Sequence, residues 1–183
     1  DFNVPIKNGS VIDDFRIKKV LPSINYLKSK GAKIILISHI EPLSGEKVSL
    51  EPVCKHLSYL GISCNFIKNY RNALSFINGM NNGDIVLLEN LRDNEGEKKN
   101  DKAFAKELAS LGDVYINDAF SVSHRDHASI SAITEFIPSY AGMLFENEVK
   151  YLTSAFNPDR PFLFILGGAK FETKLPLIEK FTN

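Results

Sequence analysis

Five short apolar runs, separated by segments with helical character, constrain the fold of this chain more than any other feature of its sequence. The runs are apolar on both faces, which is typical of strands buried in a parallel sheet. They cover residues 33–38, 63–67, 84–90, 113–118 and 161–168. The helical segments cover residues 15–29, 49–60, 70–77, 101–111 and 145–156. This alternation predicts an α/β fold with a three-layer, doubly wound and mostly parallel sheet of the Rossmann-like kind.

Local signals mark the ends of several elements. Asn8-Gly9 predicts a tight turn, which we prefer to the glycosylation acceptor that the same residues formally complete with Ser10. Ser49 is expected to cap the helix that follows it. Three glycines follow predicted helices as C-terminal stops do: Gly31, Gly61 and Gly112. The polar run 93–101 is expected to form a solvated loop before a helix.

Composition excludes some classes of partner. The 22 basic and 22 acidic side chains give a net charge of zero, so the chain has no basic footprint for nucleic acid or for an anionic membrane. No apolar run reaches transmembrane length. The only cysteines, Cys54 and Cys64, are expected to be reduced thiols of a cytosolic protein. We therefore predict a cytoplasmic location.

Arginine and histidine side chains follow three of the predicted strands. They are His39, Arg92, His124, Arg125 and His127. Because the carboxyl ends of parallel strands meet at one edge of a sheet, we expect these side chains to converge there, near Arg16 of the first connection. Arginine offers a rigid fork for phosphate or carboxylate, and histidine can donate from either ring nitrogen. The convergence predicts a site for a small anion.

Each of these residues also has a plainer interpretation. An arginine after a strand is often part of a surface ion pair, and His39 alone is often a structural hydrogen-bonding residue. His124 and His127 are three residues apart, as in some metal sites, but no set of cysteines or carboxylates completes a coordination sphere.

A second notable stretch is Leu-Gly-Gly-Ala-Lys-Phe-Glu-Thr-Lys, residues 166–174. A strand that runs into two glycines and then a helix lets the backbone approach a phosphate closely. Lys170 and Lys174 are four residues apart and would share one helix face. The stretch is not a Walker A loop, and the alternative is a tight turn with solvated lysines.

These stretches together resemble the phosphoglycerate kinase family. The matching motifs are DFNVP (1–5), DDFRI (13–17), SH (38–39), SLEPV (49–53), LLENLR (87–92), DVYINDAF (113–120) with SHRDHAS (123–129), and RPFLFILGGAK (160–170). They occur in the family's order over nearly the whole chain. The resemblance implies a phosphotransferase with a carboxyl acceptor that acts in glycolysis and gluconeogenesis. It would transfer a phosphoryl group reversibly between 1,3-bisphosphoglycerate and ADP, giving 3-phosphoglycerate and ATP.

The resemblance also implies a role for each residue that matches a family motif. Asp1 and Asn3 would hold the hydroxyl and carboxyl end of the glycerate, and Arg16 would lie beside the acyl phosphate as charge develops. The grip on the remote phosphate would come from His39, Arg92 and Arg125. Lys170 would contact the transferring phosphoryl group, and Lys174 would lie near the nucleotide phosphates. Mg²⁺ would arrive with ATP or ADP, and the protein is expected to be a monomer.

The resemblance further predicts the division of the chain. Residues 1–143 would form the domain that binds 3-phosphoglycerate, residues 144–157 the helix between domains, and residues 158–183 the first strand and helix of the nucleotide domain. We expect the chain to be a fragment of a longer enzyme, inactive alone, with Asp1–Asn3 at the end of a strand whose beginning is missing.

Three departures from the family pattern stand out. The family's Ser-His-Leu-Gly-Arg-Pro becomes Ser-His-Ile-Glu-Pro at 38–42, so a phosphate-gripping arginine is missing. Glu41 is expected to repel the ligand there unless a loop lysine such as Lys47 compensates. Phe15 replaces the usual threonine before Arg16, and Phe171-Glu172 stands where small and polar residues are common.

Two other classes of function remain as alternatives. The missing arginine favours a non-catalytic α/β module that binds a phosphorylated ligand without turnover. A plain α/β interaction domain would leave the set of motifs unexplained.

Overall fold

The computed structural model describes residues 1–41, 46–163 and 165 of the chain. The chain divides into two compact units, Asp1–Phe145 and Glu146–Asn183. Among the described residues, no helix is both long and apolar enough to cross a membrane.

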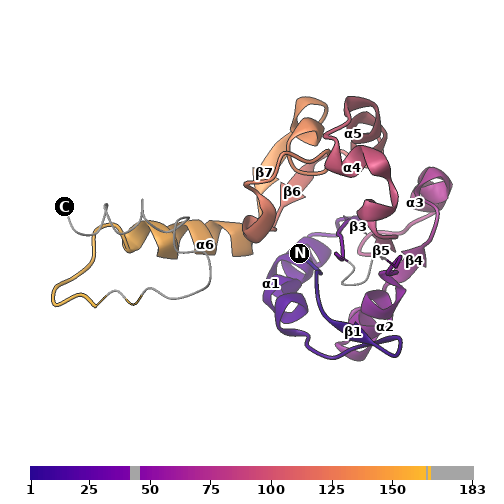
Figure 1. Ribbon diagram of the computed structural model, residues 1–183. Helices are drawn as coiled ribbons and strands as arrows, with labels where there is room; N and C mark the ends of the chain where they lie inside the picture. Colours follow the sequence, from indigo (N-terminus) through magenta and orange to yellow (C-terminus); the bar gives the residue numbers. More distant parts are fainter. Residues whose placement is uncertain (42–45, 164, 166–183) are drawn as a thin grey trace. The chain divides into compact units, whose positions relative to one another are not determined.

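A parallel sheet of three strands lies in the first unit. β3 (Ile34–Leu36) and β4 (Asn65–Ile67) both pair with β5 (Ile85–Leu88), so the strand order is β3-β5-β4 (Figure 1). The register places Val86 opposite Ile35 on one side and Asn65 on the other. All four residues of β5 are buried. This confirms the prediction of a buried parallel strand for the run 84–90, and the runs 33–38 and 63–67 supply its two parallel neighbours. In the predicted strand 161–168, the described residues 161–163 and 165 are not in a strand.

Alternate residues of β5 face two separate hydrophobic cores. Ile85 and Leu87 belong to a core that includes residues of α1 (Phe15–Ser29) and α2 (Glu51–Tyr59). Val86 and Leu88 belong to a second core that includes residues of α3 (Ala73–Asn78) and α5 (Lys102–Ala109). Successive side chains of a strand point to opposite faces of its sheet. Helices therefore cover both faces, which confirms the three-layer α/β prediction.

The helices lie close to their predicted positions. α1 has the predicted bounds, and α3 is preceded by a short 3₁₀ helix, η1 (Tyr70–Asn72). α2 begins two residues after Ser49, so the N-cap position belongs to Leu50. The Ser49 hydroxyl still accepts a hydrogen bond from the backbone N–H of Glu51 at 3.1 Å. Cys54 and Cys64 are free thiols, as predicted.

The described strands form three small sheets rather than one continuous sheet. β1 (Ile6–Lys7) and β2 (Ser10–Val11) form an antiparallel hairpin, and β6 (Tyr115–Asn117) pairs in parallel with β7 (Ser139–Ala141). The hairpin confirms the Asn8-Gly9 turn, because both residues have positive φ, 50° and 73°. A short hairpin of this kind was not among the predicted strands.

The first five residues are not a strand, which corrects our expectation for the opening of the chain. Most of their hydrogen bonds are local or involve a side chain, and one backbone hydrogen bond runs from the Ile12 N–H, just after β2, to the Pro5 carbonyl at 3.0 Å. The Val4 N–H donates to the Phe2 carbonyl at 2.8 Å, and the Phe2 N–H donates to the Ser38 hydroxyl at 2.8 Å. Phe2 and Val4 are nevertheless buried in the first core, so this segment is held by packing.

Helix α6 (Met143–Ser154) begins at the end of the first unit and continues into the second. The apolar side chains Tyr151, Leu163 and Ile165 are exposed there. The predicted first strand and helix of a nucleotide domain fall mainly on residues 164 and 166–183, which lie outside the described residues. The predicted domain boundaries remain predictions.

Candidate functional site

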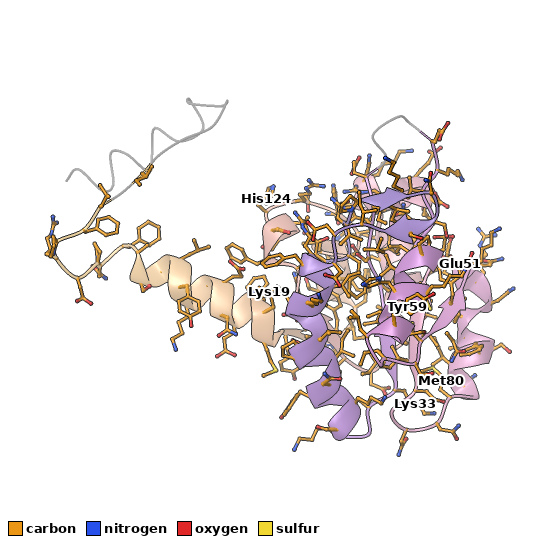
Figure 2. The ribbon with its side chains drawn as sticks, turned by 90° about the horizontal axis from the view of Figure 1, so that it is seen from below. Lys19, Lys33, Glu51, Tyr59, Met80 and His124 are labelled. Carbon is orange, nitrogen blue, oxygen red and sulfur yellow. The ribbon has the colours of Figure 1, made fainter. Side chains whose placement is uncertain are left out.

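The predicted anion-binding residues follow strands β3, β5 and β6 at their carboxyl ends. Figure 2 shows Lys33 and Met80, which precede β3 and β5, at one end of the first unit and His124 at the opposite end. His124 is exposed. The segments after the three strands therefore gather at the edge where open α/β sheets bind ligands.

An ion pair joins the opening of the chain to the first helix. The Asp1 carboxylate accepts hydrogen bonds from Arg16 Nη1 at 2.6 Å and from the Ser121 hydroxyl at 2.8 Å. The Asp1 side chain is 9% exposed, whereas that of Arg16 is 48% exposed. Arg16 thus keeps donors toward solvent while Asp1 holds its guanidinium. Sequence analysis named Asp1 and Arg16 but not Ser121.

Asn3 connects this pair to the segment after β3. Its side-chain oxygen accepts from the backbone N–H of Glu41 at 3.3 Å, and its own backbone N–H donates to Asp1 Oδ1 at 2.9 Å. The predicted residues of the glycerate end are therefore in one hydrogen-bonded group with Glu41, the last residue of the Ser-His-Ile-Glu stretch.

His39 is buried, and its Nε2 has no hydrogen-bond partner among the described residues. Burial, together with the charges of Arg92 and Arg125, lowers the pKa of His39 to about 4. The imidazole is therefore neutral at neutral pH. His39 belongs to the predicted group as a hydrogen-bonding side chain and not as a cation.

Arg92 is the most deeply placed cation of the group. Its side chain is 5% exposed, and its Nε lies 3.3 Å from Glu41 Oε2. Among the described residues, Nε and Nη1 lack a hydrogen-bond partner. Burial lowers the pKa of Arg92, and the charge of Glu41 opposes that effect. Buried guanidinium N–H groups without acceptors are costly, and an anion that accepts from them would relieve that cost.

Arg125 and His127 follow β6 and complete the group. Burial is the main cause of the lowered pKa of His39, Arg92 and His127, and the positive charge of Arg125 lowers each of them further, which indicates that these side chains share one electrostatic environment. The Arg125 backbone N–H donates to the Val122 carbonyl at 2.9 Å, in the turn after the 3₁₀ helix η3 (Phe120–Val122). Predicted residues from three separate strand exits are thus brought together.

The polar run 93–101 is structured, which corrects the prediction of a solvated loop. It contains the end of η2 (Leu91–Asp93) and α4 (Glu95–Lys98), and Glu97 is only 2% exposed. Its carboxylate accepts from the Ser129 N–H at 3.0 Å and the Ser129 hydroxyl at 2.7 Å. Glu97 therefore anchors the segment that carries Arg125 and His127. Because Glu97 lies in a strongly charged run, its burial was not predicted from the sequence.

Asn90 was also missed, although it organises two parts of the site. Its side-chain oxygen accepts from the backbone N–H groups of Ile40 and Arg92, each at 3.1 Å. Its amide nitrogen donates to the carbonyls of Ile40 and Val48 at 3.0 and 2.9 Å. One buried amide thus fixes the segment after β3 relative to Arg92. The position of Asn90 just after a buried strand is the sequence signal that could have identified it.

Glu41, the acid expected to repel a ligand, is paired with cations. Its Oε1 lies 2.7 Å from Lys98 Nζ, and its Oε2 contacts Arg92. The hydrogen bond from Lys98 holds the pKa of Glu41 below its ordinary value, so the carboxylate is ionised at neutral pH. The lysine beside Glu41 among the described residues is Lys98, rather than the Lys47 that sequence analysis suggested.

Other predicted features stay untested or add little. Lys170, Lys174 and Phe171-Glu172 lie outside the described residues. Phe15 is 63% exposed, with Lys19 Nζ 5.2 Å from its ring centre. No group of three or more potential metal ligands gathers among residues 1–41, 46–163 and 165, and so nothing there supports a metal site at His124 and His127.

A cavity of about 250 Å³ lies between α1, β3 and β6. Its walls are largely apolar, with side chains such as Val20, Ile24 and Ile35, and Asp1 and His39 also line it. Because anion recognition requires convergent polar donors, we place the anion site at the arginines rather than in this apolar space.

Comparisons with known proteins identify the family to which this chain is similar. A family model described as phosphoglycerate kinase matches residues 1–183. A phosphoglycerate kinase of Wolbachia pipientis subsp. Culex pipiens (strain wPip) is 50% identical over 189 residues, which cover 100% of this chain and 48% of that protein. The phosphoglycerate kinase of Coprothermobacter proteolyticus is 48% identical over 188 residues, which cover 98% of this chain and 48% of that protein.

Solved structures are similar too. The crystal structure of phosphoglycerate kinase from Pyrococcus horikoshii OT3 has a TM-score of 0.86 at 33% identity, over 97% of this chain and 47% of that one. The structure of phosphoglycerate kinase from Coxiella burnetii has a TM-score of 0.82 at 34% identity, over 97% and 46%. This chain thus spans about half the length of the curated relatives it matches. With the family model matched from the first residue to the last, the chain belongs to the phosphoglycerate kinase family.

Proposed function

We propose that this chain is the substrate-binding part of a phosphoglycerate kinase. The complete enzyme would transfer a phosphoryl group reversibly between 1,3-bisphosphoglycerate and ADP, giving 3-phosphoglycerate and ATP. The observation that carries the proposal is the buried guanidinium of Arg92, whose Nε and Nη1 lack hydrogen-bond partners among the described residues. His39 Nε2 also lacks such a partner and shares its electrostatic environment with Arg92 and Arg125. A phosphate would supply acceptors to all three side chains.

The proposed grip on the remote phosphate combines different kinds of donor. Arg92 and Arg125 would supply positive charge, while neutral His39 would supply a hydrogen bond. Binding energy from this non-reacting end of the substrate would position the reacting end and favour closure of the complete enzyme. This part of the proposal concerns binding and orientation.

The reacting end of the substrate would lie at the Asp1, Asn3 and Arg16 group. Asp1 orients the Arg16 guanidinium through the 2.6 Å contact, and Arg16 remains half-exposed. Phosphoryl transfer requires little covalent work from a protein, but it requires cations beside the equatorial oxygens. Arg16 would stabilise that developing charge, in the manner of preorganised donors that contribute about 2.7 to 4 kcal/mol to a barrier.

The nucleotide half of the reaction would depend mainly on residues beyond this group. Lys170 would contact the transferring phosphoryl group, and Lys174 the nucleotide phosphates. Mg²⁺ would arrive bound to ATP or ADP and neutralise phosphate charge. No group of three or more acidic, histidine or cysteine ligands lies within the described part of the chain, so we assign none of its residues to the metal. We further propose a cytoplasmic monomer.

Titration of the chain with 3-phosphoglycerate, followed by NMR or calorimetry, tests the proposed site. The chain should bind weakly, and Arg125→Ala should abolish binding because it removes one of the two arginine charges. Lys33→Ala is a matched control, since it also removes one positive charge and Lys33 is an exposed residue that precedes β3, at the opposite end of the sheet (Figure 2). Binding unchanged in Arg125→Ala would remove this residue from the site.

A non-catalytic phospholigand-binding module is the second candidate, and it is favoured by one observation. Glu41 places a carboxylate beside Arg92, where a phosphate grip would otherwise be purely cationic. A coupled assay of ADP and ATP turnover on the complete protein separates the two candidates. A folded complete protein that binds 3-phosphoglycerate without turnover would support the module and contradict the kinase.

A further inference from the structure

One carboxylate bridges two cations at the edge of the candidate site. Glu41 Oε1 lies 2.7 Å from Lys98 Nζ, and Glu41 Oε2 lies 3.3 Å from Arg92 Nε. The three residues come from three segments: the stretch after β3, the 3₁₀ helix η2 and the last residue of α4. The bridge therefore depends on tertiary structure and is not a pair along one helix.

The members of the bridge differ in their freedom to move. The side chain of Arg92 is 5% exposed, whereas those of Glu41 and Lys98 are 45% and 56% exposed. Arg92 is held by its surroundings, while Glu41 and Lys98 can turn toward solvent at small cost, because exposed ion pairs are weak. An incoming anion can thus replace Glu41 without moving the buried guanidinium.

We propose that Glu41 is an internal competitor for the anion site and that a phosphate group displaces it and takes both Arg92 and Lys98 as partners. Lys98 then becomes a phosphate-binding residue. This inference rests on the proposed function, because it assumes a phosphorylated ligand at Arg92.

The chemistry of the two anions favours the exchange. A carboxylate carries one negative charge, whereas a phosphate monoester carries up to two and presents three acceptor oxygens. Among the described residues, neither Nε nor Nη1 of Arg92 has a hydrogen-bond partner, although Nε lies 3.3 Å from Glu41. A phosphate can accept from several of these donors at once, and the fork of arginine matches its geometry. The displaced Glu41 carboxylate returns to water, where its charge is well solvated.

The neighbouring pair of Lys99 and Glu95 provides a comparison within the same segment. Their side chains are 2.9 Å apart and 70% and 88% exposed, and they are spaced i, i+4 along the chain. Changes in this pair alter net charge by the same amount as changes in Glu41 and Lys98, close to the same place in the sequence. They serve as matched controls for general electrostatic effects.

The test measures the dissociation constant of 3-phosphoglycerate for the 183-residue chain by NMR or calorimetry. Glu41→Gln should tighten binding by about threefold or more, since it removes the competitor. In the Glu41→Gln background, Lys98→Gln should weaken binding by a similar factor, since the phosphate loses a partner. Glu95→Gln and Lys99→Gln should change it by less than about twofold. The differences should vanish with D-glycerate, which lacks the phosphate.

A second measurement uses the unchanged protein. The side-chain ¹³C carboxyl resonance of Glu41 should shift on saturation with 3-phosphoglycerate, and its pKa should rise as the Lys98 hydrogen bond is lost. A resonance that does not move would overturn the inference, as would equal effects of Glu41→Gln and Glu95→Gln. If neither the unchanged chain nor Glu41→Gln binds 3-phosphoglycerate, the proposed function fails as well. Binding with unchanged affinities defeats the exchange alone.

Discussion

Replacement of the buried Glu97 is the sharpest test of how the site is held together. Glu97 is 2% exposed and accepts two hydrogen bonds from Ser129, one from the backbone N–H and one from the hydroxyl. Its backbone carbonyl also accepts from the Ala128 N–H at 3.0 Å. Glu97→Ala removes both side-chain acceptors but keeps the backbone contact. The variant isolates the contribution of the carboxylate to the segment that carries Arg125.

The expected loss of stability follows from these contacts. A buried N–H left without an acceptor costs about 1 to 3 kcal/mol, and the lost hydroxyl bond adds about 1 kcal/mol. The removed methylene contributes about 0.8 kcal/mol. Relief of the carboxylate from burial acts in the opposite direction, because burial raises the pKa of Glu97. The free energy of unfolding should fall by about 2 to 4 kcal/mol.

Glu97→Gln is the matched control. Its oxygen can accept from the Ser129 N–H, and its NH₂ group can donate to the Ser129 hydroxyl oxygen, so the variant should lose less than about 1 kcal/mol. It also removes a titration. Since the folded-state pKa of Glu97 is raised, the protonated form favours folding, and the unchanged protein should lose stability relative to Glu97→Gln as pH rises from about 4.5 through the folded-state pKa.

Urea unfolding followed by circular dichroism measures these differences, and the 3-phosphoglycerate titration measures their effect on the site. Both should be recorded for the unchanged chain and the two variants. Equal stability of Glu97→Ala and the unchanged chain would refute the anchoring role. A difference between Glu97→Gln and the unchanged chain that stays constant with pH would refute the reasoning about burial.

Two further predictions concern packing and acid stability. Gly142→Ala should lower the free energy of unfolding by about 1 to 3 kcal/mol, because the new Cβ would lie 2.7 Å from the Cβ of Asp118. In the same urea assay, Gly79→Ala should have little effect, because the atom nearest to its new Cβ would be 3.5 Å away, and equal effects of the two substitutions would contradict this prediction. The folded state lowers the pKa of His39 to about 4, so the unfolded chain binds a proton at this residue first as the pH falls. His39→Gln should therefore reduce the loss of stability between pH 6.5 and 4. The same acid sensitivity in both proteins would argue against a neutral, buried His39.

The strand and helix pattern was accessible from sequence because it depends on local periodicity. The run that becomes β5 is apolar at every position, and both of its faces are buried. The Asn8-Gly9 turn was accessible for a similar reason, since positive φ is favoured by those residue types. The opening residues were expected to lie at the end of a strand, and the structure has no strand there. Phe2 and Val4 are buried without a strand partner.

The site residues were named largely from motifs, but their states depend on distant neighbours. Glu97 lies in a run of charges that looks solvated, and only the approach of Ser129 explains its burial. His39 was named from its motif as part of the grip on a phosphate, and only its burial beside Arg92 shows that it is neutral. Glu41 was expected to repel a ligand unless a nearby lysine compensates, and the structure pairs it with Lys98. Each of these outcomes depends on residues far apart in the sequence.

The sequence by itself determined the α/β class of this protein, most of its helices and the strands β3 to β6, because periodicity and turn chemistry act over a few neighbouring residues. It did not predict α4 or the parallel strand β7. Its motifs also identified the family and the cations that follow the strands. Tertiary structure alone decided that Arg92 is buried, that His39 is neutral and that Glu41 bridges Arg92 to Lys98. Burial and charge pairing are set by groups brought together from separate segments, and local sequence carries no record of those distances.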